Sequence, residues 1–183
     1  MSKENADKEQ KRSFKREVFS WIACIVVTIL LTEFILNFVI INANIPSGSM
    51  ENTIMTNDKL IALRTSYWFN DPKRGDIIIF KYPDDETEWF IKRVIALPGE
   101  TVLVKDGKVY INGSKKALSE TYIKEEPVED FGPYKVPKNG YFVMGDNRNN
   151  SNDAREWETH YVSRDEVLGK AWFRYYPSIK VIK

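Results

Sequence analysis

The chain has 183 residues, of which 43% are hydrophobic and 29% charged, and its formal net charge at pH 7 is +1. Beyond residue 41, 21 Lys and Arg stand against 21 Asp and Glu, so composition gives no basic face and nucleic-acid binding is not expected. The only cysteine, Cys24, lies in an N-terminal apolar stretch. This position excludes a disulfide, a thiol nucleophile and a cysteine-based metal site from the rest of the chain.

A long apolar segment occupies residues 18–41 and contains no Lys, Arg or Asp. In a helix, about 20 apolar residues cross a hydrocarbon core of about 30 Å, so we expect one transmembrane helix here. A cleaved signal peptide is the alternative reading. Its apolar core would be only about 7 to 15 residues long and would end in small residues of the Ala-x-Ala kind. Asn42-Ala43-Asn44 does not supply that site, and we therefore favour a retained anchor.

Basic residues precede the apolar segment, and cytoplasmic flanks are the ones that carry an excess of Lys and Arg. They are Lys3, Lys8, Lys11, Arg12, Lys15 and Arg16. The sequence therefore predicts a single-pass protein of the cell membrane, with a basic cytoplasmic tail over residues 1–17 and an extracytoplasmic domain over residues 42–183. That domain is long enough to bury a core of its own.

The outer domain contains short runs rich in Val, Ile, Phe, Tyr and Trp, separated by Pro, Gly, Asn and Asp. Such runs predict β-strands, and we place them at residues 59–64, 76–81, 89–95, 101–105, 108–112, 140–144 and 170–175. Asp106-Gly107 predicts a two-residue hairpin turn, because both residues tolerate positive φ. We expect an exposed excursion over residues 114–138 and a short helix over residues 163–167. The predicted fold class is mainly β, a single N-terminal transmembrane helix followed by an antiparallel β-sheet domain.

Ser49 and Lys92 stand in contexts that suit nucleophilic catalysis. A serine hydroxyl needs a base beside it, which is usually histidine, although a neutral lysine can serve. His160 is the only histidine, and its polar surroundings favour a surface or packing role. Lys92 lies in the apolar run 89–95, where burial would lower its pKa from about 10.4 toward 7 or 8. The alternative for Lys92 alone is an ordinary outward-facing strand lysine.

Three further motifs follow in a fixed order. They are Gly-Asp-Ile-Ile-Ile-Phe at 75–80, Leu-Pro-Gly-Glu at 97–100 and Met-Gly-Asp-Asn-Arg-Asn-Asn-Ser-Asn-Asp-Ala-Arg at 144–155. Together with Ser49, Lys92 and one membrane anchor, they make the chain resemble the bacterial type I signal peptidases. These are membrane-bound leader peptidases that remove signal peptides from exported proteins. The resemblance runs from the anchor through Tyr176-Pro177, and its specificity comes from the order of the motifs, since each alone is weak.

The resemblance implies a role for each matching residue. Ser49, directly before Met50, would be the nucleophile of a Ser/Lys serine endopeptidase, and Lys92 its general base. Ser47 matches the serine whose hydroxyl forms the oxyanion hole with the backbone N–H of Ser49, and Ser151 matches the serine that orients the lysine. Residues that match the ion pairs supporting the site are Asp146, Arg148, Asp153 and Arg155. In isolation this last motif would be a solvated turn of Asn and Asp residues.

Two positions depart from the family's pattern. Asn52 stands in Ser-Met-Glu-Asn-Thr, where a Ser-Met-x-Pro-Thr sequence is common. Because losing proline frees φ and restores an N–H donor, we expect the loop after Ser49 to be more flexible here. Ala154 stands where a serine is common, which removes one supporting hydrogen bond.

For substrate, the resemblance implies secretory preproteins with small side chains one and three residues before the scissile bond. The resemblance also implies contact with the lipid bilayer and allows the export machinery as a partner. It implies no cofactor or metal. An extended peptide adding to the edge of the strand around Phe90 is the expected binding mode, since main-chain hydrogen bonds are indifferent to sequence. The residues expected to flank a shallow apolar pocket are Ile45, Pro46, Met50, Ile54, Phe90 and Ile91.

Two rival functions remain at this stage. A self-cleaving repressor-type peptidase has a similar Ser/Lys β-fold, but it would carry a DNA-binding domain in place of the anchor. A catalytically inert, membrane-tethered β-domain that binds exported peptides would not need Ser49 and Lys92, and both are present.

Overall fold

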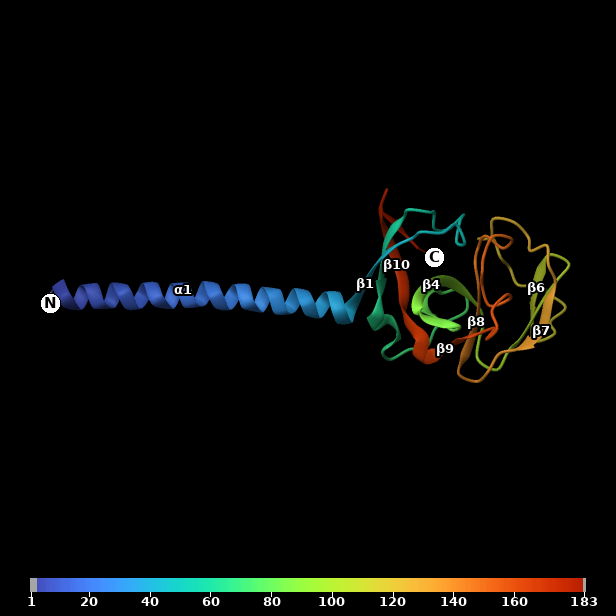
Figure 1. The fold of residues 1–183 in the computed structure, drawn as a ribbon, viewed down its shortest axis with the longest axis horizontal. Helices are drawn as coiled ribbons and strands as arrows, with labels where there is room; N and C mark the ends of the chain where they lie inside the picture. The colour runs from blue at the N-terminus through green and yellow to red at the C-terminus, as the bar shows by residue number, and fades with distance from the viewer. Residues whose placement is uncertain (1–2, 183) are drawn as a thin grey trace. The chain divides into compact units, whose positions relative to one another are not determined.

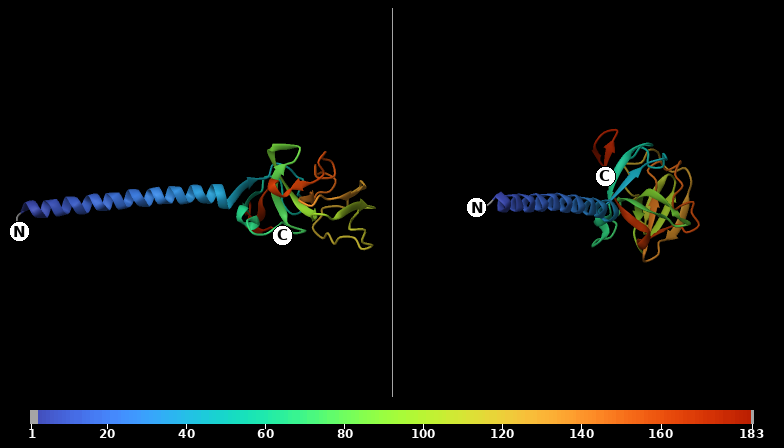
Figure 2. Two further views of the ribbon diagram at one scale, coloured as in Figure 1. Left: turned by 90° about the horizontal axis from the view of Figure 1, so that it is seen from below. Right: turned by 60° about the vertical axis from the view of Figure 1, so that its left-hand side comes forward.

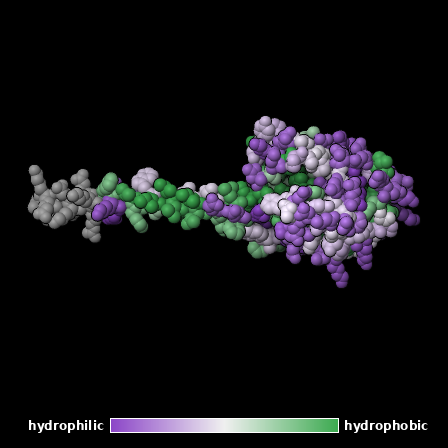
Figure 3. Space-filling view, viewed as in Figure 1, coloured by the Kyte–Doolittle hydropathy of each residue, from purple (hydrophilic) through white to green (hydrophobic). Residues whose placement is uncertain are grey.

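The computed structural model describes residues 3–182, and side chains from residue 14 onward. Helix α1 (Lys3–Phe34) continues into a π-helical turn (Ile35–Val39). Among the described residues, Phe14–Val39 is the one helical stretch long and apolar enough to cross a membrane, and Figure 3 shows its apolar side chains as a green surface. After Val39 the chain enters a second compact unit that begins at Ile40.

The end of the apolar segment differs from the sequence-based expectation. Residues 40 and 41 were expected to lie in the membrane span, but they open strand β1 (Ile40–Asn44). Ile41 pairs with Ala62 of the neighbouring strand β2 (Lys59–Leu63) and is buried in the domain. A continuous apolar run gives no mark where helix changes to strand, because β-branched residues suit a buried strand as well as a membrane.

The second unit is built on an eight-stranded sheet in which every strand pair is antiparallel (Figures 1 and 2). The strand order is β1-β2-β10-β3-β4-β8-β9, and β11 also pairs with β10. The remaining strands of this sheet are β3 (Ile77–Tyr82), β4 (Asp85–Ala96), β8 (Gly140–Met144), β9 (Val162–Ser163), β10 (Val167–Tyr176) and β11 (Lys180–Val181). The mainly antiparallel β fold predicted from the sequence is confirmed.

A smaller sheet has the order β6-β5-β7, with strands β5 (Thr101–Lys105), β6 (Lys108–Ile111) and β7 (Phe131–Lys135). The turn between β5 and β6 has positive φ at Asp106 and Gly107, 50° and 74°. Strand β7 lies inside the stretch 114–138, which was expected to be only an exposed excursion. Phe131 and Tyr134 of β7 contact Phe142 of β8, and these aromatic contacts explain why a stretch with few apolar residues still forms a strand.

The predicted short helix at 163–167 is a single 3₁₀ turn, η3 (Arg164–Glu166). The two-residue strands β9 and β11 were not predicted, because two residues carry no measurable periodicity.

The core divides into two apolar clusters on opposite faces of β3. Ile77 and Ile79 pack into one cluster with Met50 and Ile54, whereas Ile78 and Phe80 pack into the other. Since side chains alternate along a strand, β3 is buried on both faces. The same alternation along the neighbouring β4 gives Lys92 and Arg93 opposite faces of the sheet.

Candidate active site

Ser49 lies in the loop between β1 and β2, and this loop is fixed from two sides. From inside, the fully buried side chains of Met50 and Ile54 anchor it in the core. From the loop after β8, the Asn147 amide donates to the Gly48 carbonyl at 3.0 Å, and the Asn147 backbone N–H donates to the Ser49 carbonyl at 3.0 Å. The position of the Ser49 backbone is therefore set by residues about 100 positions further along the chain.

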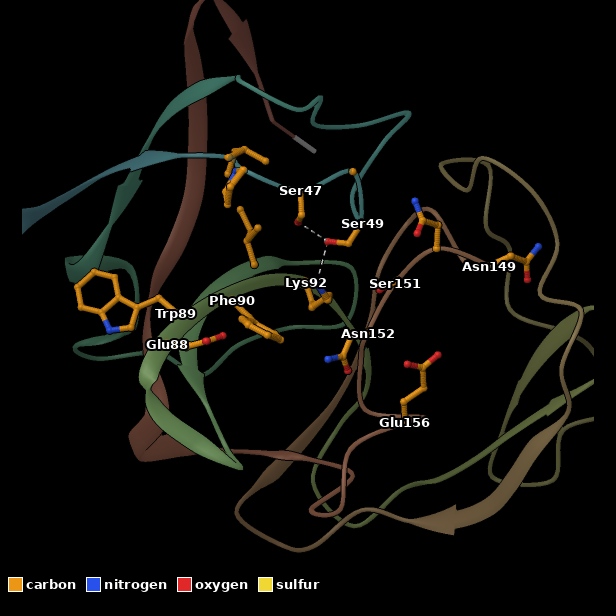
Figure 4. A pocket seen from close by; sticks show the side chains of 15 residues that line it. Ser47, Ser49, Glu88, Trp89, Phe90, Lys92, Asn149, Ser151, Asn152 and Glu156 are labelled. Carbon is orange, nitrogen blue, oxygen red and sulfur yellow. Dashed lines mark hydrogen bonds between the residues drawn. The ribbon is translucent and has the colours of Figure 1, made fainter.

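The Lys92 ammonium nitrogen lies 2.8 Å from Ser49 Oγ, within hydrogen-bond distance (Figure 4). Lys92 is only 4% exposed and Ser49 7%. Burial lowers the pKa of Lys92 to about 8, although the nearby Asp153 carboxylate acts in the opposite direction. About a tenth of Lys92 is therefore neutral at pH 7 and about half at pH 8, and the neutral amine can accept a proton from the serine.

Two other serines lie close to this pair. Ser47 Oγ is 3.5 Å from Ser49 Oγ. Ser151 is buried, and its Oγ has no hydrogen-bond partner among the residues that the structure describes. No hydrogen bond joins Ser151 to Lys92 in that part of the chain, so the orienting role implied for Ser151 stays a prediction.

Gly145 lies against both the Ser49 backbone and the Ser151 side chain. A Cβ at this position would overlap both Ser151 Oγ and the Ser49 carbonyl oxygen. Its backbone N–H donates to Asp153 Oδ2 at 2.9 Å, so the glycine backbone cannot move away freely. The sequence motif contains this glycine, but only the fold shows that its missing side chain leaves space for Ser151 Oγ and the Ser49 carbonyl oxygen.

Gly145→Ala is expected to lower turnover about 10²-fold, because a displacement near 1 Å of a catalytic group can cost that much. Overpacking should also lower stability, by about 1 to 3 kcal/mol. Initial-rate kinetics on a precursor and thermal unfolding would measure the two effects. Gly113→Ala is the control: it strains a positive φ of 67° but meets open space, so stability should fall without loss of turnover. Equal turnover in the Gly145→Ala and unmodified proteins would contradict the steric argument.

The four charged residues of the last motif take part in three ion pairs. Asp153 pairs with Arg155 inside the motif. Asp146 accepts two hydrogen bonds from the Arg93 guanidinium, at 2.8 and 2.7 Å, and Arg148 donates two to Glu120, at 2.9 and 2.6 Å. The first of these two pairs is 2% and 0% exposed at its side chains, and the second 0% and 6%.

Sequence reasoning missed Arg93 and Glu120 as members of this arrangement. Arg93 had a usable signal, because the strand neighbour of an inward-facing lysine must point to the other face of the sheet. Glu120 lies in a polar stretch with no periodicity, so nothing local marked it. Removing one partner of a buried pair leaves an uncompensated charge and costs about 3 to 5 kcal/mol.

A cleft of about 690 Å³ opens beside the Ser49–Lys92 pair (Figure 4). Four of the six residues expected to flank a substrate pocket line it, namely Ile45, Pro46, Phe90 and Ile91. Met50 and Ile54 do not line it; they lie in the core beneath the loop. Both were inferred from chain proximity to Ser49, but alternate residues of a buried loop point away from the cleft.

His160 contributes nothing to the pair. Its Nδ1 lies 2.8 Å from the Ala154 carbonyl, and its ring packs between Phe131 and Tyr134. Within residues 14–182, no group of three or more His, Cys, Asp and Glu side chains could hold a metal ion.

Two strand edges face the cleft. Strand β1 pairs with β2 alone, and the part of β4 before Arg93 pairs with β3 alone among the described strands. A smaller adjoining cavity of about 240 Å³ is lined by residues of both strands, including Ile41, Ala43, Trp89 and Ile91. The curled sheet thus brings two free edges, separated by three strands in sheet order, to opposite sides of one groove.

Comparisons with known proteins place the chain in one family. Residues 18–176 match the family model described as signal peptidase, peptidase S26. Probable signal peptidase I-2 of Synechocystis sp. is 44% identical, covering 85% of this chain and 72% of its own length, and signal peptidase I of Bacillus amyloliquefaciens is 34% identical, covering 96% and 97%. A crystal structure of a signal peptidase I from Enterococcus faecalis V583 is 36% identical, with a TM-score of 0.48, and the match covers 55% of this chain and 97% of that one. The chain therefore belongs to the signal peptidase family, peptidase S26, a family of serine endopeptidases.

Proposed function

We propose that this protein is a membrane-bound endopeptidase that removes signal peptides from exported preproteins, with Ser49 as nucleophile and neutral Lys92 as general base. The observation that carries the proposal is the 2.8 Å contact between Lys92 Nζ and Ser49 Oγ in a buried site. Burial supplies the neutral amine, since the charged form is disfavoured away from water. The exposed cleft beside the pair supplies the access that a polypeptide substrate needs.

The reaction follows from these positions. The Lys92 amine takes the proton of Ser49 Oγ while the oxygen attacks the scissile carbonyl carbon. The negative charge that develops on the carbonyl oxygen is stabilised by the Ser47 hydroxyl and the Ser49 backbone N–H. The protonated Lys92 then gives its proton to the departing amine, which becomes the N-terminus of the mature protein. Lys92 then takes a proton from a water that attacks the acyl carbon. This proton passes to Ser49 Oγ as the acyl bond breaks, and the signal peptide leaves with a C-terminal carboxylate.

The substrate segment before the scissile bond would lie extended between the free edges of β1 and β4. Main-chain hydrogen bonds to a strand edge do not depend on side chains, which suits an enzyme with many substrates. Ile45, Pro46, Phe90 and Ile91 give the cleft its apolar lining, and small side chains at the two positions one and three residues before the bond fit it.

The test is cleavage of a purified precursor by the full-length chain in detergent. A precursor with Ala at positions −1 and −3 should yield one product, whose new N-terminus is identified by mass spectrometry. The same precursor with Phe at −1 should not be cut, and the Ser49→Ala protein is the matched negative control. Absence of cleavage by the unmodified chain, or equal cleavage by the Ser49→Ala chain, would refute the proposal.

The proposed topology is single-pass, with the basic residues in the first half of α1 in the cytoplasm and the catalytic domain outside. Phe14–Val39 is long and apolar enough for the span, and the excess of Lys and Arg before and at the start of this stretch supports the orientation. Protease added to intact spheroplasts should digest the domain that begins at Ile40. Protection of this domain until the membrane is ruptured would reverse the assignment.

Ser47→Ala is expected to lower turnover about 10² to 10³-fold with little change in KM, as removal of one oxyanion donor does. The Ser47 hydroxyl is near Ser49 Oγ rather than bonded to Lys92, so the pH at which activity is half-maximal should not move. Steady-state kinetics across pH would check both statements. A shift in the pH of half-maximal activity would show that Ser47 acts on the Lys92 base and not on the oxyanion.

A further inference from the structure

Residues 120–124, with the sequence Glu-Thr-Tyr-Ile-Lys, form a segment that we call the strap. The strap is attached to the parts of the chain that carry Lys92 and Ser151. Glu120 holds Arg148 through two hydrogen bonds, and the Tyr122 ring lies 3.9 Å from the Arg93 guanidinium carbon. The Lys124 backbone N–H donates to the Asp146 carbonyl at 3.0 Å. The strap itself is half-buried or exposed, but its partners Arg93, Asp146 and Arg148 are buried, and these contacts attach it to the domain beside the site.

Asn52, three residues after Ser49, joins the nucleophile loop to the strap. Its side-chain amide donates to the Tyr122 carbonyl at 2.9 Å and to the Ile123 carbonyl at 3.3 Å. The neighbouring ion pair between Glu51 and Lys124 is exposed, and an exposed pair contributes little. The Asn52 amide is therefore the main link between the two segments on this side of the loop.

The backbone at Asn52 explains why an asparagine stands there. Its φ is +87°, a left-handed conformation that proline, locked near −65°, cannot adopt. Glycine and asparagine enter this region with little cost. The next residue, Thr53, then donates from its hydroxyl to Asp146 Oδ2, and Asp146 in turn holds Arg93. The expectation that the loop is more flexible without proline stays a prediction, but the Asn52 amide gives the loop a hydrogen-bonded attachment that a proline side chain could not make.

We propose that Asn52 is a positioning residue, which fixes the nucleophile loop to the strap so that Ser49 Oγ stays within reach of Lys92 Nζ. The inference rests on the proposed function, because its effect is on that reaction. Asn52 is exposed and lines neither the cleft nor the adjoining cavity. Its contribution is therefore to turnover and not to substrate binding.

The test compares Asn52→Gly with Asn57→Gly in the full-length protein. Glycine accepts the left-handed backbone at both sites, so each variant loses only a side chain and gains unfolded-state entropy. Asn57 is the matched control: it lies in the same loop, it has a φ of +68°, and its side chain makes no hydrogen bond among the described residues. Asn52→Gly should lower kcat about tenfold with KM changed less than twofold. Asn57→Gly should leave both constants within twofold of the unmodified protein.

Asn52→Asp tests the N–H donor of the side chain while keeping the size of the side chain. Aspartate has nearly the same size and tolerates the same φ, but it replaces an N–H donor with a carboxylate facing two carbonyl oxygens. Its kcat should fall at least as far as that of Asn52→Gly. Because Lys92 remains buried in all three variants, the pH at half-maximal activity should not change.

Three outcomes would overturn the inference. They are a kcat for Asn52→Gly within twofold of the unmodified protein, equal falls for Asn52→Gly and Asn57→Gly, and a wild-type kcat for Asn52→Asp. All three presuppose that the unmodified chain cleaves the precursor. If the unmodified chain does not cleave it, the proposed function fails first, and the inference fails with it.

Discussion

Ser49→Ala should lower precursor cleavage on the order of 10⁶-fold, the scale seen when a serine nucleophile that acts as a unit with its base is removed. The residual rate would come from the oxyanion donors, which stay in place. The loss should be in kcat, because the Ser49 hydroxyl is the attacking group, whereas the apolar residues that line the cleft are unchanged. Single-turnover cleavage with enzyme in excess over precursor would measure so slow a rate.

A matched control shows that the loss belongs to the hydroxyl at this position. Ser114→Ala makes the same change on an exposed turn, where the hydroxyl bonds to the Lys116 backbone and to no other described residue. Its activity should equal that of the unmodified chain. Substantial activity in the Ser49→Ala protein would end the assignment of the nucleophile.

Lys92→Arg should be inactive at every pH, although it keeps the positive charge, because a guanidinium does not deprotonate in proteins. In the unmodified enzyme, activity should rise with pH as Lys92 loses its proton. The sign follows from burial, which disfavours the charged form and lowers the pKa of Lys92 to about 8. About a tenth of the enzyme is then competent at pH 7, about half at pH 8 and about nine tenths at pH 9. A pH profile of kcat/KM measures this midpoint.

Two further variants keep this prediction decisive even if arginine disturbs the fold. Lys92→Met removes a buried amine without adding bulk, so it should fold at least as stably as the unmodified chain and still be inactive. Lys81→Arg makes the conservative change on an exposed lysine of β3 that pairs with Glu86, and it should remain active. An activity midpoint near 10, or a working Lys92→Arg enzyme, would show that the base lies elsewhere.

The parts of the fold that the sequence predicted are those governed by local patterns. The apolar runs became β2, β3, β4, β5, β6, β8 and β10 with shifts of a few residues at their ends. The Asp106-Gly107 turn followed from backbone chemistry alone. Strand β7 was missed because its stabilising contacts, those of Phe131 and Tyr134 with Phe142, are made across the fold.

In the site, too, residues within a motif could be predicted from the sequence, whereas their partners far away in the chain could not. Ser49 and Lys92 could be named from their motifs, and the structure places their side chains together. The partners of Asp146 and Arg148 could not be named, because Arg93 and Glu120 are 53 and 28 residues away from them. Met50 and Ile54 were misplaced for a related reason, since the direction of a loop side chain depends on the core beneath it.

The place of β10 in the sheet makes the Ser49–Lys92 contact depend on a strand far along the chain. This strand, made of residues 167–176, lies between β2 and β3. Until it inserts, the half of the sheet next to Ser49 has no strand pairing to the half that carries Lys92. Pairings between such distant segments form late in folding. Assembly of the Ser49–Lys92 pair therefore waits for β10 to insert, and we expect a domain without this pairing to lack hydrolytic activity.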